Sequence, residues 1–226
     1  MRRAALFDVD GTLTDTNHLH VTTWWEAFRQ AGQQVAMHDI HRAIGLGSTD
    51  LIAHLLGEDR DHDRDEEISA AHSTLYGTYF NRLPALEGAS DLLHALHDRG
   101  WRVVLATSAG GRELEALRRA IDADDVIVGI ASADDVSSGK PAPDPVHHAL
   151  EIAECAPDQA LFVGDTVWDM RAASRAGVRS IALLSGGIPR GDLEAAGAAA
   201  VYAHPAELLS RLDSEVLADN ANNTNN

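Results

Sequence analysis

The chain has 226 residues, of which 45% are hydrophobic, and its 35 acidic and 18 basic residues give a formal net charge of −17. This length and apolar content fit a globular protein with one large domain, or a core with an insert, and exclude a disordered chain. The negative charge argues against nucleic acid and against an anionic membrane as partners, but a metal or a few cations within one cleft would still admit a small anionic substrate.

The first predicted strand covers residues 4–8 and leads into acidic residues. Asp8 and Asp10 end this apolar run, and they point the same way if residues 5–10 stay extended, because side chains alternate along a strand. Two adjacent carboxylates at the end of a buried strand repel each other unless a cation or a proton lies between them. Gly11 then allows the chain to turn away from the strand. Either aspartate alone could instead be a solvated acid at a strand end.

The segment between this strand and the next one contains helical patterns and no convincing strand. The predicted helices cover residues 18–31, 49–56 and 66–82. We therefore expect an all-helical cap domain, residues 16–83, inserted after the first strand at the carboxyl edge of the sheet, where ligands bind in open α/β folds. Residues 1–15 and 84–218 would form the core, and the polar tail at 219–226 would be disordered.

After residue 83, predicted strands and helices alternate. Continuous apolar runs predict strands at residues 102–107, 126–130, 160–165, 180–184 and 200–203. Helical patterns lie among them at residues 88–100, 112–120, 144–154 and 167–176. Continuous apolar runs are typical of parallel strands that are covered on both faces. The alternation therefore predicts an α/β fold with a doubly wound parallel sheet.

Polar side chains also follow three of the later strands. Thr107 and Ser108 stand ahead of a helix whose N-terminus could bind phosphate oxygens. Lys140, the only lysine in the chain, lies in the stiff segment GKPAPDP, where a compact ammonium charge is available. Asp165 and Asp169 would share one helical face. Helix capping would explain any one of these hydroxyl or acidic residues taken alone.

The carboxyl ends of parallel strands meet at one edge of a sheet, so these side chains would form a single site. Acids that hold a cation, a lysine that offsets an anion and a hydroxyl that donates a hydrogen bond are the parts of a phosphoryl-transfer site. Mg²⁺ is the expected cofactor, because it prefers oxygen ligands. The expected partner is a small phosphorylated metabolite, and the sequence predicts no oligomeric state.

The chain carries no predicted targeting or membrane segment. Cys155 is the only cysteine, so an intrachain disulfide and a cysteine-based zinc cluster are excluded. The apolar run near Met1 stops at Asp8 and is too short for the core of a signal peptide. No apolar stretch approaches the roughly 18 residues of a membrane-spanning helix. We therefore expect a cytoplasmic protein.

Four segments in this order, DVDGTLTD, ATS, GKPAPDP and GDTVWD, resemble the motifs of the haloacid dehalogenase superfamily. The resemblance covers the whole core, for which it implies a Rossmann-like fold. The position of the helical insert resembles the cap of phosphoglycolate phosphatases and β-phosphoglucomutases. The resemblance implies a Mg²⁺-dependent phosphatase that acts on a small phosphomonoester, such as phosphoglycolate or a sugar phosphate.

The same resemblance implies a role for each core residue. Asp8 would attack phosphorus and become an aspartyl phosphate, and Asp10 would protonate the leaving alkoxide and then deprotonate the hydrolytic water. Thr107 and the Ser108 N–H would bind phosphoryl oxygens. Lys140 would offset the charge on Asp8 and on the phosphoryl group.

The resemblance also implies a set of metal ligands. A carboxylate oxygen of Asp8, the main-chain carbonyl of Asp10 and the carboxylate of Asp165 would hold Mg²⁺. Asp169 would join them directly or through a water molecule.

Other activities of the superfamily need residues that differ from those present. Dehalogenases lack the acid two residues after the nucleophile, where this chain has Asp10, and phosphonatases use a cap lysine, whereas no lysine lies between residues 15 and 85. His20 falls where a mutase would have its cap histidine and is a candidate substrate contact. A β-phosphoglucomutase-type mutase therefore stays an alternative, although its cap lysine and its loop arginine, expected within residues 43–50, are both missing.

Two further hypotheses describe the protein as something other than an enzyme of this superfamily. A response-regulator receiver would be about half as long, with its phosphorylated aspartate on a later strand. A non-catalytic sugar-phosphate sensor could keep the fold, but it would have little reason to keep Asp8, Asp10, Lys140 and Asp165 together. Further candidates for the cap face are Trp24, Trp25, Ser48, Tyr76, Tyr79 and Arg82. Of these, Trp24 and Trp25 fit the apolar stripe of a helix, so we expect them in a core.

Overall fold

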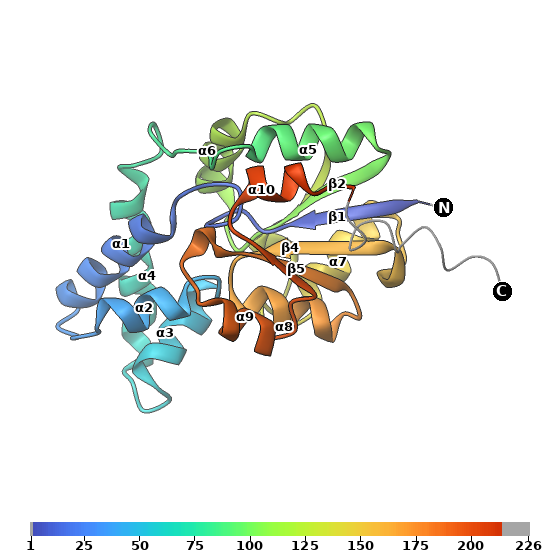
Figure 1. Ribbon diagram of the computed structural model, residues 1–226. Helices are drawn as coiled ribbons and strands as arrows, with labels where there is room; N and C mark the ends of the chain where they lie inside the picture. The colour runs from blue at the N-terminus through green and yellow to red at the C-terminus, as the bar shows by residue number, and fades with distance from the viewer. Residues whose placement is uncertain (1, 214–226) are drawn as a thin grey trace.

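The computed structural model describes residues 2–213 (Figure 1). Within these residues, six parallel strands form one sheet in the order β3-β2-β1-β4-β5-β6. They are β1 (Arg3–Phe7), β2 (Trp101–Ala106), β3 (Ile127–Ala131), β4 (Ala160–Gly164), β5 (Arg179–Leu183) and β6 (Ala200–Tyr202). The doubly wound α/β fold is therefore confirmed, and every predicted strand lies within one residue of its observed position.

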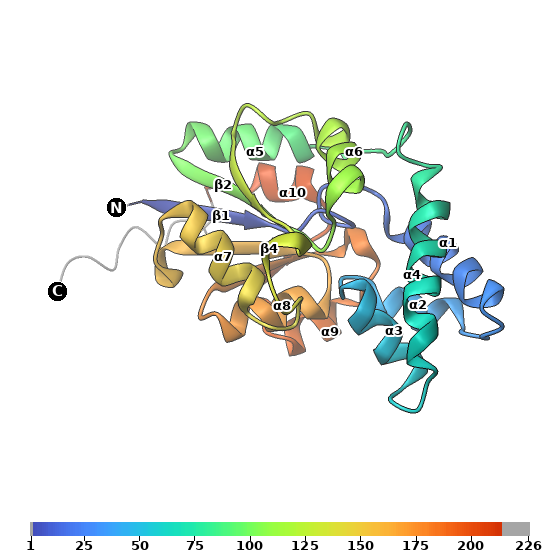
Figure 2. The same cartoon turned by 180° about the vertical axis from the view of Figure 1, so that it is seen from behind.

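Helices cover both faces of the sheet (Figures 1 and 2). One face carries α5 (Ala89–Asp98), α6 (Gly111–Ile121) and α10 (Pro205–Ser210), and the other carries α7 (Asp144–Ala153), α8 (Val167–Arg175) and α9 (Arg190–Ala195). Side-chain alternation along β1 explains this division. Ala5 and Phe7 belong to the hydrophobic core of the first face, and Ala4 and Leu6 belong to that of the second.

A group of four helices lies beyond the carboxyl ends of the strands (Figure 1). Their buried side chains form a hydrophobic cluster separate from those of the sheet. It is built from α1 (Asn17–Gln30), α2 (Met37–Ala43), α3 (Ser48–Leu56) and α4 (Asp65–Gly77). In α1, Val21, Trp24 and Phe28 recur at helical spacing, so one face of the helix is buried in this cluster. All of these helices lie inside the residue range 16–83 that was predicted as an all-helical cap. We call this cluster of helices the cap.

One predicted cap helix is longer than the observed one. The pattern at residues 66–82 predicts a single helix, but α4 ends at Gly77. Glycine is a poor helix former, and beyond it the backbone makes tighter turns, with the Tyr79 N–H donating to the Tyr76 carbonyl and the Arg82 N–H to the Tyr79 carbonyl. The chain therefore bends back toward the sheet five residues earlier than predicted.

The two connections between sheet and cap lie side by side. The Asp15 N–H donates to the Pro84 carbonyl at 3.0 Å, and the Leu86 N–H donates to the Leu13 carbonyl at 2.9 Å. Because the chain leaves and returns next to the carboxyl end of β1, the cap faces the sheet edge where the polar motifs end. The tail predicted to be disordered, residues 219–226, lies outside the described residues. Within residues 2–213, no helix is both long and apolar enough to cross a membrane.

Candidate active site

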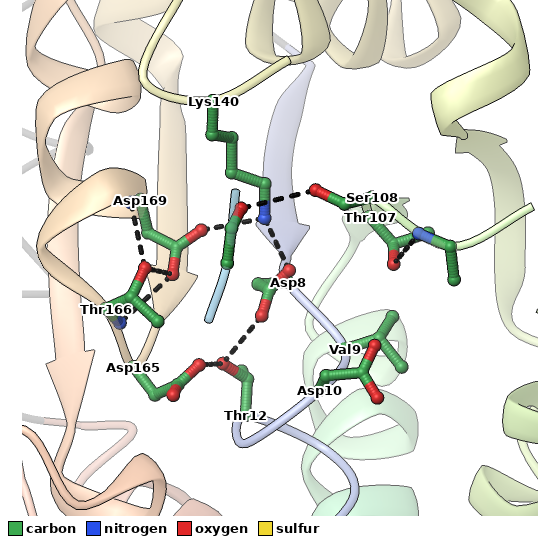
Figure 3. Close-up of polar contacts among 12 residues, drawn as sticks. Asp8, Val9, Asp10, Thr12, Thr107, Ser108, Lys140, Asp165, Thr166 and Asp169 are labelled. Carbon is green, nitrogen blue, oxygen red and sulfur yellow. Dashed lines mark hydrogen bonds and ion pairs between the residues drawn. The ribbon is translucent and has the colours of Figure 1, made fainter. Parts of the chain in front are cut away.

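The sheet register brings the predicted strand ends together (Figure 3). Phe7 in β1 pairs with Leu105 in β2 and with Val163 in β4, so Asp8, the next residue, lies between the ends of both neighbours. Thr107 follows β2 and is buried beside it. Asp8 therefore lies at the carboxyl edge of the sheet, as the sequence predicts, and the strand order places it near the middle of that edge.

Lys140 is an ammonium group enclosed by carboxylates. Its side chain is only 1% exposed, and its Nζ donates to a carboxylate oxygen of Asp8 and, at 2.8 Å, to Asp169 Oδ1. Burial alone would lower the pKa of Lys140, but the charges and hydrogen bonds of Asp169 and Asp8 raise it above its ordinary value. The single lysine of the chain is therefore charged and holds two of the predicted site residues.

Asp165 is held by two residues that the sequence analysis did not single out. Thr12 Oγ1 donates to Asp165 Oδ1 and Asn17 Nδ2 donates to Asp165 Oδ2, each at 2.8 Å. A Cβ atom at Gly11 would collide with both Asp165 and Asn17, and Gly11 has a φ of 76°. Glycine at this position therefore permits both the turn after β1 and the close approach of Asp165. Thr12 lies in the first motif, DVDGTLTD, and its hydroxyl was the feature of the sequence that indicated a polar contact at this site.

The sequence left open that these acids only cap a helix. Capping applies to Asp169, and it does not apply to Asp165. Thr166 caps α8, since its Oγ1 accepts a hydrogen bond from the Asp169 N–H, and Asp169 Oδ2 accepts hydrogen bonds from both the N–H and the hydroxyl of Thr166. Asp169 therefore has two structural roles, because it completes the cap with one oxygen and binds Lys140 with the other.

The carboxylates of Asp8, Asp165 and Asp169 fit a divalent cation. Each offers an oxygen, these oxygens lie within 4.8 Å of one another, and all three residues are buried. Burial raises the pKa of Asp8 to about 7 despite Lys140, and burial together with Asp8 and Asp169 raises that of Asp165 well above its ordinary value. One ammonium cannot offset three carboxylates, so a hard cation such as Mg²⁺ matches both the charge and the oxygen ligands.

Asp10 does not continue β1, so the condition under which Asp8 and Asp10 would point the same way along one strand is not met. The strand ends at Phe7, and the N–H groups of Thr12 and the next two residues all donate to the Val9 carbonyl, which turns the chain. The Asp10 carboxylate instead accepts a 2.5 Å hydrogen bond from Thr16 and lies 3.2 Å from His20 Nε2. Burial would raise the pKa of Asp10, but His20 and Thr16 together lower it.

His20 is fixed from several sides at the junction of cap and sheet. Its Nδ1 lies 3.2 Å from His72 Nε2, its ring stacks on Tyr76 at 3.9 Å, and its Nε2 lies 3.7 Å from Glu113 Oε1. His72 in turn stacks on Trp24 at 3.9 Å. The sequence analysis missed His72 and Glu113. His72 and Tyr76 are four residues apart in α4, so the sequence alone indicates that they lie on the same face of this helix.

A cavity of about 80 Å³ opens between the cap and the sheet edge, and Asp8, Asp10 and His20 are among the residues that line it. Of the four predicted substrate contacts, His20 and Ser108 belong to its wall, whereas Thr107 and Lys140 do not line it. Among the cap-face candidates, Trp24 and Ser48 line this cavity, although Trp24 also belongs to the cap core as expected. The others do not line it, and they are Trp25, Tyr76, Tyr79 and Arg82.

Acid should destabilise the protein through His72. Burial lowers the pKa of His72 to about 2, with a contribution from the nearby His20, whereas a histidine in the unfolded chain has a pKa of 6.5. As the pH falls below 6.5, the unfolded state binds a proton that the native state refuses, so the free energy of unfolding decreases. We expect His72→Gln to remove up to about 1.4 kcal/mol per pH unit from this dependence, measured by urea unfolding at a series of pH values.

The matched control for this experiment is His38→Gln, because His38 is exposed. That variant should keep the pH slope of the parent protein. A His72→Gln protein whose slope equals that of the parent would contradict the prediction.

Comparisons with known proteins extend these observations. A protein-family model described as haloacid dehalogenase-like hydrolase matches residues 2–177. The crystal structure of a hydrolase from Pseudomonas syringae matches with a TM-score of 0.90 at 36% identity, covering 95% of this chain and 99% of that one. The family match spans β1 to the end of α8, which includes the carboxyl ends of β1, β2, β3 and β4 and the site residues that follow them.

Two curated relatives carry named activities. A phosphoglycolate phosphatase from Nitrosospira multiformis is 29% identical over 181 residues, which cover 77% of this chain and 80% of the relative. The pyrophosphatase PpaX of Bacillus cereus is 26% identical over 180 residues, which cover 79% of this chain and 81% of the relative. The similarity to both therefore extends over most of each protein.

Proposed function

This chain belongs to the haloacid dehalogenase-like hydrolase family, and from that premise we propose that it is a cytoplasmic, Mg²⁺-dependent phosphatase that cleaves a small phosphomonoester. The observation that carries the proposal is the position of Asp8. It lies at the carboxyl edge of the sheet, beside one buried ammonium and two further carboxylates, and it lines a cavity. The names of the phosphatase and pyrophosphatase relatives support the same reaction type.

In the first step, a carboxylate oxygen of Asp8 attacks phosphorus, the bond to the leaving oxygen breaks, and an aspartyl phosphate forms. Lys140 offsets negative charge on Asp8 and on the incoming phosphoryl group, since its ammonium already contacts Asp8. Thr107 and the N–H of Ser108, at the neighbouring strand end, would bind phosphoryl oxygens ahead of α6.

Asp10 would move the protons in both steps. It lies on the wall of the same cavity, two residues from the nucleophile, and it would protonate the leaving oxygen first and then take a proton from the attacking water. His20 and Thr16 keep it ionised in the free protein, which is the state that the second step needs. A bound phosphate dianion would raise the pKa of Asp10 by like-charge repulsion, which favours the protonated state that the first step needs.

Asp8 and Asp165, with Asp169 and the main-chain carbonyl of Asp10 as further ligands, would hold the Mg²⁺ ion. When bound, this ion supplies positive charge that lowers the pKa of Asp8 and offsets the charge of the phosphoryl group. The hydrogen bonds from Thr12 and Asn17 orient Asp165 for that role.

A phosphosugar mutase is the alternative that the sequence left open. His20 lines the cavity, as a mutase cap histidine would. However, the chain has no lysine between residues 15 and 85, and the loop at 43–50 carries no arginine. A mutase must hold the second phosphate of its bisphosphate intermediate, and among the described residues neither an arginine nor a lysine lines the cavity for that purpose. Hydrolysis is therefore the function that we propose.

The test is the release of inorganic phosphate from p-nitrophenyl phosphate and from a panel of phosphorylated metabolites, with Mg²⁺ and with excess EDTA. We expect turnover with Mg²⁺, and we expect EDTA to abolish it and added Mg²⁺ to restore it. No phosphate release from any compound in the presence of Mg²⁺ would refute the proposed function. Turnover that survives EDTA would refute the role of the metal.

A further inference from the structure

The lining of the cavity is poor in positive charge. Among the residues that the structure describes, neither an arginine nor a lysine lines it, and its two histidines are His20 and His72. Burial lowers the pKa of His72 to about 2, so of these two His20 is the side chain that carries a positive charge near neutral pH. Lys140 is buried and is not part of the lining. A group attached to the phosphate would therefore meet no cation beyond His20.

Glu113 adds a carboxylate to this wall. It lies in the first turn of α6 and lines the cavity with a side chain that is 23% exposed. Its closest cationic partner is His20, at 3.7 Å, but the same His20 nitrogen lies nearer to Asp10, at 3.2 Å. One imidazole therefore serves two carboxylates. Burial raises the pKa of Glu113 to about 7, so a hydrogen-bond donor bound beside it favours its ionised form, and a second anion bound there opposes it.

From this wall, and resting on the proposed phosphatase function, we propose that Glu113 determines the substrate class. It admits phosphomonoesters whose alcohol part carries a hydroxyl or an ammonium group, and it rejects those that carry a carboxylate or a second phosphate. A hydroxyl or an ammonium would donate a hydrogen bond to the Glu113 carboxylate. A second anion would face Glu113 and Asp10, and the one nearby cation, His20, already pairs with both of these carboxylates. Such like-charge contacts disfavour binding.

The apolar and polar side chains of the cavity wall bear on the same selectivity. Apolar side chains, Trp24 and Leu51 among them, form one part of the wall, and Glu113 is the acidic side chain that α6 adds to its polar part. Phosphoglycolate, which ends in a carboxylate, is therefore disfavoured even though the family resemblance suggests it.

Three substrates of matched length test this proposal directly. O-phosphoethanolamine, 2-hydroxyethyl phosphate and phosphoglycolate end in an ammonium, a hydroxyl and a carboxylate on the same short chain. We expect kcat/KM for phosphoglycolate to be at least about tenfold below that for each of the other two, since unpaired like charges cost several kcal/mol at an interface. Phosphoglycolate turned over as well as either of the other compounds would overturn the proposed selectivity.

The variant Glu113→Gln tests whether Glu113, and not another residue of the cavity wall, causes the substrate selectivity. It keeps the size of the side chain and removes its charge, so the ratio of kcat/KM between O-phosphoethanolamine and phosphoglycolate should fall by about tenfold, mainly through KM. Glu115→Gln is the matched control, because Glu115 is exposed on the same helix, and it should leave the ratio unchanged. An equal ratio in Glu113→Gln and the parent enzyme would overturn the assignment to Glu113.

These outcomes can be distinguished from failure of the proposed function itself. Phosphate release from p-nitrophenyl phosphate reports whether the chain is a phosphatase, and it is measured in the same experiment. An active enzyme that prefers phosphoglycolate would refute only the substrate class. A chain that hydrolyses none of the four compounds would refute the phosphatase function on which that class rests.

Discussion

The variant Asp8→Asn should lower phosphate release by a factor on the order of 10⁴ or more, because an amide cannot form the aspartyl phosphate. The substitution keeps the shape of the side chain, and Asp8 lies between strand ends that are fixed by the sheet register. We therefore expect a folded protein without turnover. The measurement is phosphate release from p-nitrophenyl phosphate with Mg²⁺, together with a thermal melt of the variant.

Asp15→Asn is the matched control for Asp8→Asn. Asp15 is the third acid of the same motif, but it is exposed and lies outside the cavity lining. Its amide variant should retain the activity of the parent. Turnover that persists in folded Asp8→Asn protein would show that another group attacks phosphorus.

Replacement of Lys140 by methionine should cost about 3–5 kcal/mol of the free energy of unfolding, because it leaves the buried carboxylates of Asp8 and Asp169 without their ammonium partner. The same change should also reduce turnover, since the charge next to the nucleophile is lost. Urea unfolding in the absence of metal measures the first effect. Added Mg²⁺ should restore part of the stability, because the cation offsets the same carboxylates.

Arg42→Met is the control for this loss of stability. Arg42 pairs with Asp192 at 3.4 Å, but its side chain is 63% exposed, so its removal should cost less than about 1 kcal/mol. If Lys140→Met and Arg42→Met were equally stable, the buried ammonium would not hold the site together as described.

The fold and the centre of the site could be predicted because both depend on local patterns. Continuous apolar runs place the strands, and side chains that follow parallel strands must meet at one edge. The short helices α2, α9 and α10 could not be predicted in the same way. Each has at most seven residues, which is too few for a clear helical period.

The surroundings of Asp10 could not be predicted because they depend on how the cap packs against the sheet. His72 comes from α4 and Glu113 from α6, and only the docked cap brings both to His20. The direction of Asp10 depends on the turn at Val9, whose hydrogen bonds compete with an extended strand. Asn17 was missed for a related reason, since its contact with Asp165 joins residues that are far apart in the sequence.

The measurement that tests the account most directly is a search for the covalent intermediate. The enzyme is mixed with p-nitrophenyl phosphate and Mg²⁺, quenched in acid within one turnover, digested and examined by mass spectrometry. The account predicts one phosphoryl group on the peptide that contains Asp8, lost on treatment with hydroxylamine and absent from the Asp8→Asn protein. A phosphoryl group on a serine, threonine or histidine, or turnover without any phosphorylated peptide, would contradict it.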